Sequence, residues 1–176
     1  MTMDFLSPIE DAIIARLKEQ MPAILVQPYP DNPEIWEPTH PVGALLVRYS
    51  DGEYSPPLDT AVVVQERELM WEVTLALWSL RGKAGQNGLY AYLEAVRTAL
   101  TGFKPSHCQR AMRPVSEEFI ARAAGNLKNK TQRLWQYAIT FSTATLNIEV
   151  AEEEQAPLLT RITAMDEQLN QTTEVP

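Results

Sequence analysis

The segment AVVVQERELMWEVTLALWSL, residues 61–80, most constrains the fold, because strand-forming residues fill almost its whole length. Successive side chains of a strand point to opposite faces of a sheet. One face of this strand is continuously apolar, and it carries Leu69, Trp71, Val73, Leu75 and Leu77. We expect helices to cover that face, and we expect a break or bulge near Gln65 and Arg67.

The opposite face of the same strand mixes apolar, small and polar side chains, and it carries Met70, Glu72, Thr74, Ala76, Trp78 and Leu80. Two helices cover only one side of a sheet. The second face is therefore either wet or in contact with another subunit, as the exposed patch of Met70, Trp78 and Leu80 suggests. The strand pattern leaves both possibilities open.

Two helices are predicted from apolar residues at helical spacing, over residues 7–22 and 89–103. Ser7 is the expected N-cap of the first helix, with Glu10 completing a capping box three residues later. Gly102 suits the left-handed cap at the end of the second helix.

Further strands are expected at 23–27, at 42–50 and at 131–150, with Asp51-Gly52 stopping the second of these. Residues 108–124 fit either a strand or a helix, and 28–41 form a proline-rich loop. GNLKNK, residues 125–130, is typical of a hairpin turn. This order predicts an α+β fold: a mostly antiparallel sheet with two helices packed on one face. We expect one domain over 1–148, followed by an acidic C-terminal extension over 149–176.

The net charge of −8 is concentrated in that extension. From Asn147 onward seven acids face one base, so the rest of the chain is nearly neutral. No basic stripe of the kind that grips nucleic acid is present. The lack of a signal peptide and the single cysteine, Cys108, predict a protein made and kept in the cytosol. In the extension, Leu158, Ile162, Met165 and Leu169 share one face of a possible amphipathic helix that would dock on a neighbour, although a disordered solubilising tail is nearly as well supported.

Catalytic, cofactor-binding and metal-binding residues are not predicted. The loop GKAGQNG, residues 82–88, lies between a strand and a helix but matches no phosphate-binding pattern, and a flexible connection is favoured. His40, His107 and Cys108 are too few to make a zinc site. Glu72 stands alone in an apolar strand, and pairing with an arginine is favoured over a catalytic role.

The stretches IEDAIIARLKEQMP, PVGALLVRY, VVVQERELMWEVTLALWSLRG and LYAYLEAVRTALTGFKP together resemble the tail terminator, or tail completion, proteins of Mu-like contractile-tailed phages and prophages. The resemblance covers about residues 5–148 and rests on the order of elements and apolar positions. It implies a ring, of six copies, that caps the completed tail at its head-proximal end, stops tube or sheath growth and offers a surface to the head-tail connector. DNA would pass through the ring without specific binding, and assembly would take place in the host cytoplasm.

Three hypotheses follow from the sequence: the ring subunit, a tail-assembly chaperone or connector adaptor that leaves the particle, and, least favoured, a small enzyme using Glu72 and the glycine loop. For the ring, one contact surface is expected around Trp78 and the 131–150 strand. The helices or proline-rich loops would supply the other. The candidate contact residues are Met70, Trp78, Leu80, Trp135, Leu158, Ile162, Met165 and Leu169.

Overall fold

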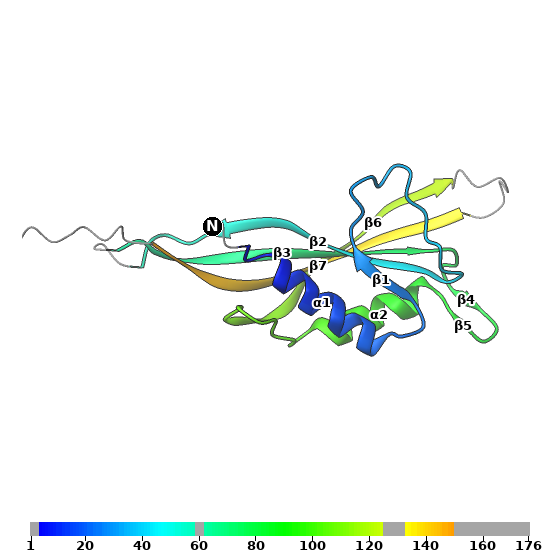
Figure 1. Ribbon diagram of the computed structural model, residues 1–176. Helices are drawn as coiled ribbons and strands as arrows, with labels where there is room; N and C mark the ends of the chain where they lie inside the picture. The colour runs from blue at the N-terminus through cyan, green and yellow to red at the C-terminus, as the bar shows by residue number, and fades with distance from the viewer. Residues whose placement is uncertain (1–3, 59–61, 125–132, 150–176) are drawn as a thin grey trace, which may run out of the picture.

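The computed structural model describes residues 4–58, 62–124 and 133–149. These form two helices and a five-stranded sheet of order β1-β2-β3-β7-β6, with a small separate hairpin of β4 and β5. The elements are α1 (Ser7–Gln20), β1 (Leu25–Pro28), β2 (Gly43–Tyr54), β3 (Val64–Leu77), β4 (Gly82–Lys83), β5 (Gln86–Asn87), α2 (Leu89–Leu100), β6 (Arg110–Ala124) and β7 (Arg133–Ile148). Both helices lie on the same side of the sheet (Figure 1). The predicted α+β class is confirmed.

The main core lies between β3 and the helices, as the alternation of β3 predicts. All five side chains of its apolar face are fully buried: Leu69, Trp71, Val73, Leu75 and Leu77. They pack in one cluster with Ile9, Ile13 and Leu17 of α1, Leu89, Val96 and Leu100 of α2, and Ile139 and Phe141 of β7. We call this side of the sheet the helix side, and the other side the open side.

The connection from β1 to β2 crosses the open side of the sheet. These two strands are parallel, so the chain must return along the sheet before it enters β2. The proline-rich loop makes that return, and Figure 1 shows it rising on the side opposite the helices. Tyr29, Pro33 and Trp36 of the loop line a hollow of about 220 Å³ together with Leu46 and Thr74 of the open side. The loop of the same chain therefore covers part of the face whose cover the sequence left open.

Two predicted boundaries are wrong for physical reasons. Asp51-Gly52 does not stop the second strand, because β2 absorbs one extra residue between Tyr49 and Asp51 as a bulge and then continues to Tyr54. The break or bulge expected near Gln65 and Arg67 is also wrong, because β3 pairs with β7 without a shift and the bulge of β2 lies opposite Met70 and Trp71. This continuation gives the sheet a long projection, which we call the arm: residues 50–54, 64–68 and 144–148 (Figure 1).

The start of α1 also differs from the prediction. Leu6 is the N-cap and Ser7 is the first helical residue. The N-cap side chain makes no hydrogen bond to the backbone of the helix. Asp4 replaces the expected capping box, because its Oδ1 accepts from the N–H groups of Leu6 and Ser7 at 3.0 and 3.1 Å. Hydrogen bonds from Ser7 and then Leu6 lower the pKa of Asp4. At the end of α2, Gly102 has the predicted left-handed conformation, with φ of 81°.

The ambiguous segment 108–124 forms the edge strand β6. Three register shifts along its pairing with β7 explain why its sequence shows no clean alternation. Bulges and Pro114 also protect an edge strand from uncontrolled pairing. The predicted turn over 125–130 and the predicted C-terminal helix lie outside the described residues. Within the described ranges, no helix is long and apolar enough to cross a membrane.

Candidate assembly surfaces

Glu72 is held in an ion pair on the open side of the sheet, as predicted. Its two carboxylate oxygens accept from Nε and a terminal nitrogen of Arg48 on β2, at 2.8 and 3.0 Å. Thr74 donates its hydroxyl to the same carboxylate at 3.0 Å. The Arg48 guanidinium also lies over the Tyr29 ring, 4.9 Å from its centre. Glu72 thus accepts three hydrogen bonds. Through Arg48, it links β2 and β3 to Tyr29 of the covering loop.

The two partners of this ion pair differ in burial, so replacing one should cost more folding free energy than replacing the other. The Glu72 side chain is 10% exposed, whereas that of Arg48 is 46% exposed. Arg48→Met should lower the free energy of unfolding by about 2–3 kcal/mol, because it leaves a buried carboxylate short of donors. Glu72→Gln should cost about 1 kcal/mol or less, since Arg48 can turn to water. Urea unfolding of both variants tests this order, and a larger loss for Glu72→Gln would contradict it.

The GKAGQNG loop is a tight hairpin of β4 and β5 with Gly85 at its turn. The backbone N–H groups of Leu89 and Tyr90, at the start of α2, donate to the carbonyls of Ser79 and Leu80 at 2.9 and 3.2 Å. Donors that would hold an anion at this helix end are therefore already used. The connection that the sequence favoured over a phosphate-binding loop is a short two-stranded hairpin.

The two histidines and the cysteine make unrelated contacts. His40 accepts a hydrogen bond from the Val42 N–H at Nδ1, and the His107 ring lies edge-on to Phe5. Cys108 is buried, and burial raises the pKa of its thiol. Across the ranges that the structure describes, no three His, Cys, Asp or Glu side chains gather as a metal site.

The predicted contact residues on and near β3 and β7 do not share one surface. Met70 is half-buried on the open side, and Trp78 is half-buried just beyond the end of β3. Leu80 packs against the helix-side core, so assigning it to the open side is wrong; β3 ends at Leu77 and its alternation stops there. Trp135 packs on the same core from β7. The remaining four candidates, Leu158, Ile162, Met165 and Leu169, lie outside the described residues.

An aromatic cluster, which we call the aromatic patch, lies on the helix side near the β6 edge. The Phe119 ring is 6.4 Å from that of Trp135 and 5.3 Å from that of Tyr137, and Tyr137 meets Tyr90 of α2 edge-on at 6.5 Å. Phe119 is 50% exposed and Tyr90 is 44% exposed. Exposed aromatic clusters of this kind are typical of protein interfaces.

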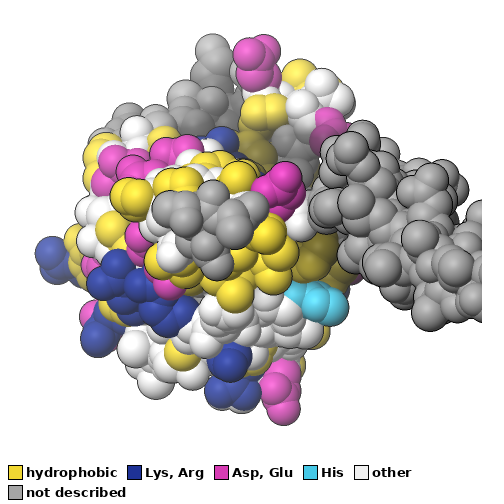
Figure 2. Space-filling model, turned by 90° about the vertical axis from the view of Figure 1, so that its left-hand side faces the viewer, with side chains coloured by type: hydrophobic (Ala, Val, Ile, Leu, Met, Phe, Trp, Pro, Cys, Tyr) yellow, Lys and Arg dark blue, Asp and Glu magenta, His cyan; other side chains and the backbone are white. Residues whose placement is uncertain are grey.

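A second apolar surface, which we call the arm tip, lies at the opposite end of the molecule. It contains Leu58, Val62, Val63 and Ile148, each between 41% and 69% exposed. Figure 2 faces this end and shows hydrophobic side chains gathered there around residues that are not described. The tip is joined to β7 by hydrogen bonds between the backbones of Val63 and Glu149 and from the Val63 N–H to the Glu149 carboxylate.

The open side between these ends carries ion pairs that cross β7. Arg113 and Arg110 of β6 reach Glu68 and Glu66 of β3 at 3.0 and 2.5 Å. They can do so because β7 presents the small residues Ser142 and Ala144 between them. Hydrogen bonds with Ser142 and then with Arg113 lower the pKa of Glu68, so the stability from this group is present near neutrality and is lost as the pH falls.

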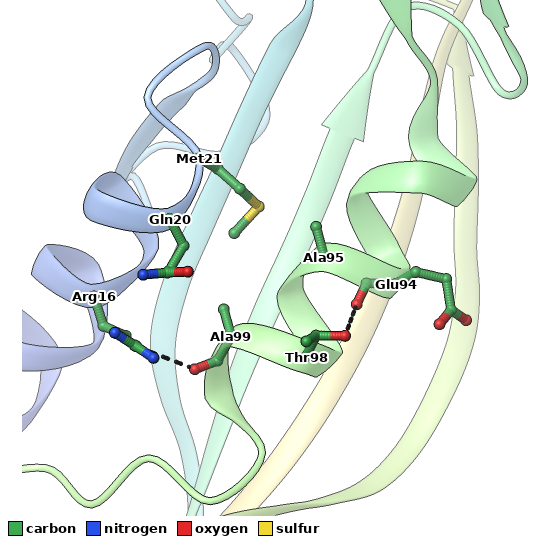
Figure 3. A pocket seen from close by; sticks show the side chains of 7 residues that line it. All are labelled: Arg16, Gln20, Met21, Glu94, Ala95, Thr98 and Ala99. Atoms are coloured by element: carbon green, nitrogen blue, oxygen red, sulfur yellow. Dashed lines mark hydrogen bonds between the residues drawn. The ribbon is translucent and has the colours of Figure 1, made fainter.

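A second hollow, of about 430 Å³, lies between α1 and α2. Figure 3 shows Arg16 and Gln20 of α1 facing Ala95, Thr98 and Ala99 of α2 across it, with Arg16 Nε donating to the Ala99 carbonyl at 3.3 Å. Its lining mixes polar and apolar groups, and it lacks the exposed aromatic side chains of the aromatic patch.

The sequence did not single out the most exposed members of these surfaces, Phe119, Tyr90 and Leu58. Phe119 lay in the segment whose structure was ambiguous, and its meeting with Tyr137 depends on the bulged register of β6. Leu58 lay in a connection with no periodic pattern.

Comparisons with known proteins give a family match and a structural match. Residues 13–167 match a family model described as Gp37 protein. No curated protein matches the chain. A chain from a solved structure described as "Virion of native gene transfer agent (GTA) particle" is similar, at 13% sequence identity and a TM-score of 0.37. That match covers 81% of this chain and 99% of the other.

Proposed function

Because the chain belongs to the Gp37 protein family, whose match spans residues 13–167, we propose that it is a structural protein of a phage-type virion. More specifically, we propose the subunit of a ring that caps the completed tail at its head-proximal end. Six such copies would stop growth of the tail tube or sheath and offer a surface to the head-tail connector. Family membership is consistent with the phage tail resemblance of the sequence.

The observation that carries the ring proposal is the presence of two unlike apolar surfaces at opposite ends of one subunit. A closed ring needs heterologous contacts, in which one patch of a subunit meets a different patch of its neighbour. The aromatic patch around Phe119 and the arm tip around Leu58 are such a pair, since one is aromatic and set beside α2 while the other is aliphatic and set on projecting strands. Exposed apolar surface on both ends supports contact with two neighbours.

The charge of the protein supports a passage for DNA. The net charge is −8, and the arginines of the open side are paired with acids. A ring through which DNA moves has to avoid tight phosphate contacts, which lysine and arginine clusters would make. The pairing of Glu72 with Arg48 also supports a structural role, because a carboxylate in an ion pair is not free to act as a catalytic acid.

A tail-assembly chaperone or connector adaptor is the second candidate, since exposed apolar surfaces also suit a protein that holds partners only during assembly. Quantitative mass spectrometry of purified particles distinguishes the two. The ring proposal expects about six copies per particle beside the known tail proteins, as the tail terminator resemblance implies. Absence of the protein from infectious particles would contradict the ring and favour the chaperone.

A further inference from the structure

Arg67, on the helix side of the arm, is a charged side chain that has no charged partner among the described residues. Its terminal nitrogen donates to the Tyr49 hydroxyl at 3.2 Å, and its guanidinium lies 5.7 and 5.6 Å from the ring centres of Tyr49 and Tyr54. Its Nε is buried and has no hydrogen-bond acceptor among the described residues. A guanidinium held this way has two aromatic walls and, among the described residues, no carboxylate to balance its charge.

Three other arginines of the sheet differ from Arg67 in this respect. Arg48, Arg110 and Arg113 each bond a glutamate of β3. In the parts of the chain that the structure describes, Arg67 has no carboxylate within ion-pair distance. Gly52 leaves room for the Tyr49 hydroxyl, because a Cβ added at Gly52 would come within 2.1 Å of it. A larger residue at position 52 would therefore displace the Tyr49 side chain from its place beside Arg67.

We propose that the acidic run Glu152–Glu154 of the same chain docks on this surface and that one of its carboxylates pairs with Arg67. The charges are complementary: three consecutive glutamates against an unpaired guanidinium. A carboxylate is also the group that best satisfies a guanidinium donor. The proposal is independent of the ring, because it concerns the chain's own C-terminal segment.

The reach of the chain fits this pairing. The described chain ends at Glu149, four residues beyond Thr145, which is the β7 neighbour of Arg67. Four strand residues span about 13 Å. Residues 150–154 can extend up to about 17 Å, so they can turn back along the arm and bring Glu153 or Glu154 to Arg67.

A carbodiimide cross-link in the full chain tests this contact. Arg67→Lys keeps the positive charge and supplies an amine that carbodiimide joins to a touching carboxylate. The expected product links position 67 to one of Glu152–Glu154, identified by peptide mass spectrometry, and its yield should fall at high salt. Arg81→Lys is the matched control, because Arg81 is exposed and also lacks a carboxylate partner among the described residues. Equal linking in both variants, or none to Glu152–Glu154 from position 67, would overturn the proposal.

Two further measurements secure the result. Amide hydrogen exchange of residues 150–156 should be several-fold faster in Arg67→Gln than in the unchanged protein, and equal exchange would contradict docking on Arg67. Cross-linking an equal mixture of isotopically light and heavy Arg67→Lys protein should give products of a single label. Mixed-label products would overturn the assignment to the same chain, whereas failure of the ring proposal would leave all these outcomes unchanged.

Discussion

A glutamate in place of Phe119 should abolish ring assembly while leaving the subunit folded. Phe119 is half exposed at the centre of the aromatic patch, so the substitution removes little buried surface from the subunit itself. In a ring the same site is covered by a neighbour, and an unpaired carboxylate buried in an apolar contact costs several kcal/mol. Because a ring closes only when each contact forms, we expect particles supplied with Phe119→Glu to resemble particles that lack the protein.

Val115→Glu is the matched control for that variant. Val115 lies on the same strand, in the bulge between Pro114 and Ser116, and it is 52% exposed, against 50% for Phe119, but it is not one of the aromatic residues that make up the patch. It should support normal particle yields, and both variants should keep the thermal unfolding midpoint within a few degrees. Equal loss of particles with Val115→Glu would contradict an interface centred on the aromatic patch. Normal yields with Phe119→Glu would contradict it directly.

Trp71→Ala should lower the free energy of unfolding by about 3–5 kcal/mol. Trp71 is fully buried in the middle of β3 and packs in the cluster that joins both helices to the sheet. Its ring also meets the Tyr49 ring edge-on at 5.6 Å, so the substitution also removes a packing contact at the base of the arm. Against a typical total stability of about 5–15 kcal/mol, the variant would be close to unfolding.

Guanidinium chloride unfolding followed by circular dichroism measures this loss. Ile35→Ala is the control, since Ile35 is 82% exposed on the proline-rich loop and should change the midpoint very little. A loss below about 1 kcal/mol for Trp71→Ala would mean that the helix side of β3 is not the core of the protein.

The parts of the fold that could be predicted are those in which the apolar residues of a single helix or strand repeat at the spacing that places them on its buried face. The helix side of β3 needed only the alternation of its apolar residues, and both helices needed only their apolar stripes. The boundaries that failed depend on partners: Asp51-Gly52 became strand because β3 continues opposite it. Leu80 moved to the core side because β3 had already ended.

The candidate surfaces were harder to predict, because each is made by segments distant in the sequence. The ion pair of Glu72 was foreseeable as a class of contact, but its partner Arg48 follows from the register of β2. The cover of the open side depends on where the proline-rich loop crosses, which local turn chemistry does not determine. The aromatic patch needs the bulged pairing of β6 with β7 and the position where α2 begins.

The most direct test of the tail-capping ring is electron microscopy of particles made without this protein. If the protein caps the tail, these particles should have tails of uncontrolled length, or complete tails that fail to join heads, and supplying the protein should restore normal particles. Tails of normal length joined to heads in its absence would contradict the account.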